Sequence, residues 1–199
     1  MEAVYVMGGN YIGHGLSWLP KFNFNCGKGF MGAPLECEGS AAAAVAGMPP
    51  EVRMVFSGFE AGVRVLTGAA LTSCAAADNP CRQAYIDRVG EGRNRFRCDC
   101  PKNIYSAVKN IFCEKIFSLM ESVSFAPSWD PLTLVAAVRG AAGAGCEEAG
   151  RGGANIVAED GTNTWLDEVP GGSNQSYLVL RDARAAADTI DELLCILPE

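Results

Sequence analysis

The stretch SAAAAVAGMPPEVRMVFSG, residues 40–58, contains the two patterns that decide the fold class. Its first half is alanine-rich and ends at two consecutive prolines, which predicts a short helix with Ser40 as its N-cap and the prolines as its stop. Its second half, VRMVFSG at 52–58, is apolar and β-branched and predicts a strand. A helix followed directly by an apolar strand is typical of α/β proteins.

The alternation extends on both sides of this stretch. AVYVM at 3–7 predicts a buried strand that runs into a Gly-Gly turn, and residues 60–74 predict a helix with a glycine interruption. NQSYLVL at 174–180 predicts another strand. Residues 182–197 carry apolar side chains at helical spacing and predict a helix with Asp182 as its N-cap. We therefore expect an α/β architecture.

Two further segments belong to this expected domain. Residues 140–153 are rich in glycine and predict a loop. Residues 154–169 predict short strands, with DGTN as the turn between them. The segment 97–127 differs, because it lacks glycine and holds three of the five lysines and three of the nine cysteines. We interpret it as an insert in a domain that otherwise covers 1–199, with helical spacing in its middle.

Charge and hydropathy exclude two classes of partner. The 199 residues are 49% hydrophobic and 20% charged, with a net charge of -7, which argues against a surface that binds nucleic-acid phosphates. No apolar run approaches the roughly 18 residues of a membrane span. A cation or a neutral small molecule is the ligand class that this composition favours.

Nine cysteines are many for a reducing compartment. Their number favours export over a cytoplasmic location, without deciding between the two. Cys74 and Cys81 either close a local loop as a disulfide or stay as two free thiols, since spacing does not fix connectivity.

The best candidate for chemistry is SWDPLT at 128–133. Pro131 suits the first helical turn, so Asp130 is expected as the N-cap. Alternatively, an acidic group at the start of a helix in an α/β protein faces a cavity and binds a hard cation or a sugar hydroxyl. Trp129 then stacks on a planar base, or else it is half-buried packing.

Other constellations are weaker. His14 is the only histidine, so sites that need two histidines are excluded. CDC at 98–100 with Cys113 lacks paired zinc-ligand spacing. KFNFN at 21–25 places Asn23 and Asn25 on one face of an extended segment, where amides can bond sugar hydroxyls or simply border an edge strand.

Taken in order, VYVMGGN, KFNFN, GSAAAAVAGMPPEVRMVFSG, NPCRQAY, SWDPLTLVAAVRG, DGTNTWL and NQSYLVL resemble the C-terminal portion of the inosine-uridine preferring nucleoside hydrolase superfamily. The resemblance covers most of residues 3–197 except 97–127. It implies an open, mostly parallel, Rossmann-like sheet with flanking helices. It also implies hydrolysis of the N-glycosidic bond of ribonucleosides, with calcium binding the ribose hydroxyls and the attacking water, and an aspartate acting as base.

The resemblance assigns roles to four residues of this chain. Asp130 matches a calcium ligand, and Trp129 matches a tryptophan that stacks on the base in purine-specific members. Met7 matches a methionine that lines the sugar pocket, and Asn23 matches an asparagine that contacts ribose. The implied partner is therefore a small-molecule nucleoside, with a purine preferred and a homo-oligomer left open.

The chain also departs from the family pattern. Lys21 stands where the family has glutamate, and Gly15 where it has asparagine. The aspartate-rich motif that supplies most calcium ligands and the base is absent, since the first aspartate is Asp78. We therefore expect a C-terminal portion of a larger hydrolase, inactive by itself. The alternative is a non-catalytic descendant that binds a nucleoside or a partner.

Overall fold

The computed structural model describes residues 3–11, 40–68, 79–83, 126–159 and 163–196.

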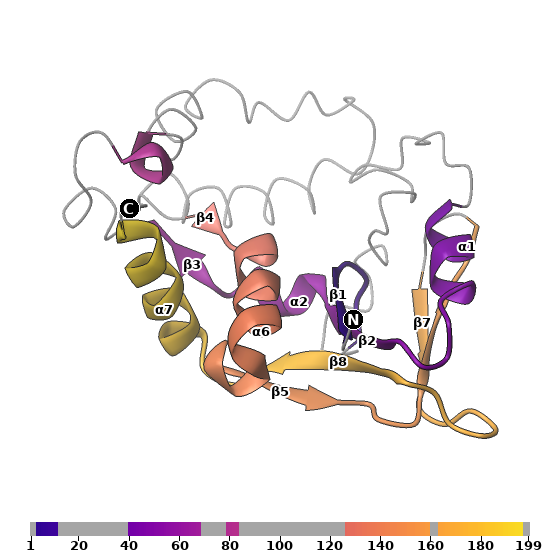
Figure 1. The fold of residues 1–199 in the computed structure, drawn as a ribbon. Coiled ribbons are helices and arrows are strands. Elements are labelled where there is room, and N and C mark those ends of the chain that lie inside the picture. The colour runs from indigo at the N-terminus through magenta and orange to yellow at the C-terminus, as the bar shows by residue number, and fades with distance from the viewer. Residues whose placement is uncertain (1–2, 12–39, 69–78, 84–125, 160–162, 197–199) are drawn as a thin grey trace, which may run out of the picture. The chain divides into compact units, whose positions relative to one another are not determined.

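The described residues, which are drawn in colour in Figure 1, belong to two compact units. The first unit comprises residues 1–65 and 128–186, and the second comprises 66–127 and 187–199. The larger part of the predicted insert at 97–127 lies outside the described residues, and so does its expected helix.

A four-stranded sheet forms the centre of the first unit. Its strand order is β1-β2-β8-β5, in which β1 pairs with β2 and β2 with β8 in parallel, while β5 runs antiparallel to β8. The sheet is therefore open and mostly parallel, as expected. Its strands are β1 (Ala3–Met7), β2 (Arg53–Ser57), β8 (Gln175–Leu180) and β5 (Cys146–Ala149).

Helix α6 (Trp129–Gly143) contacts β1, β2 and β5. Its buried residues all lie in its first half, and Gly140 interrupts the helix with a φ of 77°. A positive φ is tolerated there because glycine has no Cβ. The short helix α2 (Phe59–Gly62) follows β2 and contacts the start of α6. The buried residues of α6 are Leu132, Thr133, Val135 and Ala136.

A second layer packs on alternate residues of β2. Met54 and Phe56 point to the same face of the strand, and they form a buried cluster with Tyr11 and Val45. Val45 belongs to α1 (Ser40–Ala46), which contacts β6. The strands β6 (Ala154–Val157) and β7 (Asn163–Leu166) form an antiparallel ribbon whose Val157 and Trp165 pack on this cluster.

The second unit holds a two-stranded sheet of β3 (Leu66–Thr67) and β4 (Ala126–Pro127). Helix α7 (Ala183–Cys195) begins in the first unit and continues into the second. Asp182 accepts a 2.9 Å hydrogen bond from the Ala185 N–H, which confirms it as the N-cap. Within the second unit, the Gly68 N–H donates to the Asp191 carboxylate at 2.7 Å.

Two predictions about elements are wrong. The expected glycine-rich loop at 140–153 contains the strand β5, which is held by pairing with β8 rather than by local propensity. The expected helix at 60–74 is helical only through Gly62, and β3 follows at Leu66. Residues 69–78 lie outside the described residues. The strands at 3–7, 53–57 and 175–180 and the pair around DGTN are confirmed. The strand at 3–7 was expected to be buried, but as an edge strand it is half-buried along its whole length.

Candidate functional site

The turn that follows β1 is tied to the turn that follows β2. The Gly8 N–H donates to the Ser57 carbonyl at 2.9 Å, and the Phe59 N–H donates to the Gly9 carbonyl at 2.8 Å. Met7, the last residue of β1, is half-buried beside them. Because β1 and β2 are parallel, both turns lie at the C-terminal edge of the sheet, which is the usual place for ligands in open α/β sheets.

Trp129 packs against the second of these turns. Its indole Nε1–H donates to the Phe59 carbonyl at 3.0 Å, and its ring stacks on the Phe59 ring with centroids 5.5 Å apart. A Cβ at Gly62 would lie 2.6 Å from Trp129 Cα, so only glycine permits this approach of α2 to α6. Trp129 is half-buried. Of the two interpretations of Trp129 from the sequence, the structure thus shows half-buried packing.

Asp130 is exposed and is not the N-cap, which corrects the sequence prediction. Helix α6 begins at Trp129, two residues earlier than an N-cap at Asp130 implies, and Ser128 is the N-cap residue. The reason is backbone pairing: the Ser128 carbonyl accepts the first helical bond, from the Leu132 N–H at 3.2 Å, while the Ser128 N–H donates to the Val65 carbonyl.

Of the four residues that the resemblance singles out, Met7, Trp129 and Asp130 lie near one another, and Phe59 links them. Phe59 bonds the turn after Met7 through its N–H and bonds Trp129 through its carbonyl, and Asp130 follows directly on the helix. Asn23 lies outside the described residues. The sequence patterns did not single out Phe59, because neither of its contacts is local.

Tyr11 forms the buried side of the turn after β1. Its ring stacks on Tyr177 with centroids 5.3 Å apart and meets Trp165 edge-on. Burial, and after it the charge of Glu60, raise the pKa of Tyr11 well above its usual value, while a hydrogen bond from Asn155 lowers it by less. The phenol therefore stays protonated and donates to the Gly8 carbonyl at 2.9 Å.

A calcium ion needs several oxygen ligands close together, and the acidic groups of the described residues are the candidates for them. Among them, no cluster of three or more His, Cys, Asp or Glu side chains is placed to hold a metal ion. Calcium takes six to eight oxygen ligands, which the single carboxylate of Asp130 does not supply. The described part of the chain by itself does not fit the ion.

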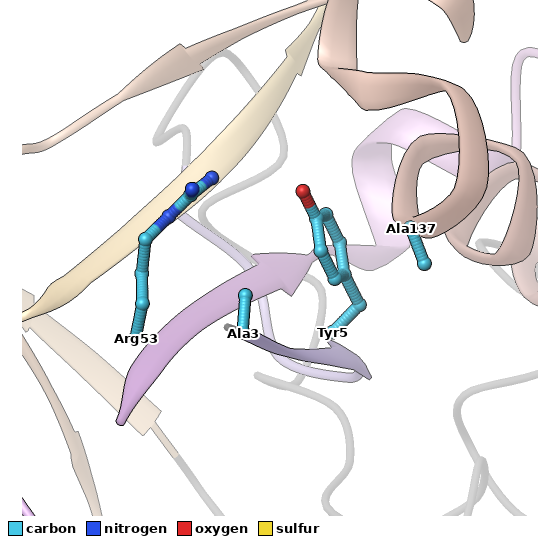
Figure 2. Close-up of a pocket in the computed structure, with 4 residues that line it drawn as sticks. All are labelled: Ala3, Tyr5, Arg53 and Ala137. Atoms are coloured by element: carbon cyan, nitrogen blue, oxygen red, sulfur yellow. The ribbon is translucent and has the colours of Figure 1, made fainter. Parts of the chain in front are cut away.

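A cavity of about 430 Å³ lies at the opposite end of the strands (Figure 2). It is lined by Ala3 and Tyr5 of β1, Arg53 of β2 and Ala137 of α6. The Arg53 guanidinium is already paired, since its Nη2 lies 2.7 Å from the Glu148 carboxylate. Because Ala3 and Arg53 are the first residues of their strands, the cavity is separate from the turns that follow β1 and β2.

The cysteines correct one of the two readings of Cys74 and Cys81. Cys81 is a free, exposed thiol, so it forms no bridge with Cys74, which lies outside the described residues. Cys195 is disulfide-bonded. Cys146 is free and buried, and burial raises its pKa to about 11.

No helix among the described residues is both long and apolar enough to cross a membrane. Comparison with protein-family models, with curated proteins and with solved structures finds no match to this chain.

Proposed function

We propose that this chain is the C-terminal portion of a nucleoside N-ribohydrolase of the inosine-uridine preferring superfamily, with purine ribonucleosides as substrates. One arrangement supports the proposal. The glycine turn after Met7 and the helix start at Trp129 both bond the backbone of Phe59. These are the two most specific pieces of the resemblance, and they meet at the C-terminal edge of parallel strands.

Each residue has a role in this proposal. Trp129 offers the accessible part of its ring to a purine, since indoles stack on planar bases. Met7 lines the sugar pocket, Asn23 contacts the ribose, and Asp130 is one ligand of a calcium ion. The remaining ligands and the catalytic base would come from outside the described residues, so no step of the hydrolysis is assigned to this chain.

A non-catalytic nucleoside-binding protein of the same fold is the second candidate. Lys21 favours it, because a positive charge stands where the family has a glutamate at a sugar-contacting position.

Calorimetric titration of the chain with inosine and adenosine, with and without calcium, tests nucleoside binding. Asp130→Asn is expected to weaken binding at least tenfold if calcium links the carboxylate to ribose. Asp167→Asn, at another exposed carboxylate, is the matched control. Ribose release by a longer product of the same gene separates the two candidates. Binding by the longer product without ribose release would favour the non-catalytic candidate. Absence of both binding and ribose release in the longer product would contradict both candidates.

A further inference from the structure

Two buried asparagines of the β6–β7 ribbon face the turn that follows β1. Asn155 is 3% exposed and Asn163 is 1% exposed. They lie on the ribbon face that carries Val157 and Trp165, while Ile156 on the other face is half exposed. Buried amides are costly unless all their polar atoms are bonded, so their partners show what they do.

Asn163 bonds both polar groups of the Asn10 backbone. Its Oδ1 accepts from the Asn10 N–H at 3.0 Å, and its Nδ2 donates to the Asn10 carbonyl at 3.3 Å. An amide side chain offers this pair of donor and acceptor, whereas a carboxylate offers acceptors only. The side chain of Asn163 thus holds two successive peptide groups of the turn, one on each side of the Asn10 Cα.

A chain of hydrogen bonds extends from Asn163 to Gly8. The Asn163 Nδ2 also donates to Asn155 Oδ1 at 3.0 Å, and the Asn155 Nδ2 donates to the Tyr11 hydroxyl at 3.2 Å. That hydroxyl donates to the Gly8 carbonyl at 2.9 Å. The turn is packed closely as well, because a Cβ at Gly9 would lie 3.0 Å from Asn163 Nδ2.

We infer that Asn163 is a positioning residue, which fixes the backbone of residues 8–10 at the edge of the sheet and thereby sets the affinity of the adjoining site for a nucleoside. The identification of the ligand as a nucleoside rests on the proposed function. The fixing of the turn does not, because it follows from the hydrogen bonds alone.

Asn163→Asp tests the inference through its dependence on pH. The ionised carboxylate accepts from the Asn10 N–H but cannot donate to the Asn10 carbonyl or to Asn155. Protonation restores one donor, and burial raises the pKa of such a carboxyl above its usual value. At pH 7.5 we expect amide exchange at Gly9 and Asn10 to be about tenfold faster than in the wild type. Lowering the pH to about 5 should recover part of the protection, after correction for intrinsic exchange.

Three comparisons keep the test decisive. Asn174→Asp, at an exposed asparagine, should show no such pH-dependent recovery. Amides of β8 should keep their protection, which separates a local effect from global unfolding. If Asn163→Asp does not fold, Asn163→Ser should show faster exchange in the same turn, because one hydroxyl cannot bond both partners.

Unchanged exchange at Gly9 and Asn10, or exchange that does not respond to pH, would overturn the inference. Parallel titration with inosine distinguishes the two proposals. A turn that loosens in Asn163→Asp, while the longer wild-type product of the gene neither binds nor hydrolyses inosine, would support the positioning role and contradict the proposed function. A nucleoside affinity that falls together with turn protection would support both.

Discussion

Replacing Glu148 by alanine should destabilise the first unit strongly. Its carboxylate accepts hydrogen bonds from Arg53 Nη2 at 2.7 Å and from the Ser176 hydroxyl at 2.8 Å, and its side chain is 14% exposed. The variant leaves the Ser176 hydroxyl, in a residue 2% exposed, without this acceptor. A buried group that loses its partner costs about 1–3 kcal/mol.

The lost ion pair adds to this cost. The Arg53 side chain is 38% exposed and can rehydrate in part, so its contribution falls below the roughly 3–5 kcal/mol of a fully buried pair. Together the two losses give about 3 kcal/mol. For a chain of this size that corresponds to a fall in Tm of roughly 6–12 °C.

Glu147 provides the matched control on the same strand. Its ion pair with Arg181 has a length of 2.8 Å, but both side chains are more than 60% exposed. Exposed pairs contribute about 0–1 kcal/mol. Thermal and urea unfolding of Glu147→Ala and Glu148→Ala should therefore differ clearly. Equal losses in the two variants would refute the reasoning that burial sets the value of these pairs.

Two further predictions follow from local geometry. Gly9→Ala should lower the free energy of unfolding by about 2 kcal/mol or more, because φ is 79° and the new Cβ would lie 2.8 Å from Tyr11 Cζ. Gly171→Ala, at a φ of 82° with open space around it, should cost only about 1 kcal/mol in the same urea titration. Alkylation followed by peptide mapping at pH 8 should modify Cys81 and spare Cys146, whose pKa of about 11 leaves few thiolates. Equal labelling of the two would contradict the burial of Cys146.

The apolar strands were predictable because their signal is local. Residues 3–7, 53–57 and 175–180 are largely apolar, and the interior strand β2 has four of its five residues buried. Apolar runs of this kind stand out in a sequence. The strand β5 was not predictable in this way. Its sequence, CEEA, has no strand pattern. The charges that it carries are matched by Arg53 of β2 and by Arg181, which follows β8.

In the candidate site too, features with a local sequence signal were predictable and long-range contacts were not. Asp130 and Trp129 were noticed because a Trp-Asp-Pro start before an apolar run is unusual in sequence, but the contact of Trp129 with Phe59 spans 70 positions. Asn163 was assigned to a turn, because DGTN is typical of one. Its partner Asn10 lies 153 positions away, so no local pattern reveals that its amide is buried.

The two edges of the four-stranded sheet differ in how they resist aggregation. The edge strand β5 has only four residues, and Glu147 stands exposed on it, so another strand that approaches this edge meets a charge. The other edge strand, β1, consists of Ala, Val, Tyr, Val and Met and carries neither charge nor proline. Among the described strands, addition of a foreign strand is therefore favoured at β1, and a lysine introduced there would be the first change to make in a chain that precipitates.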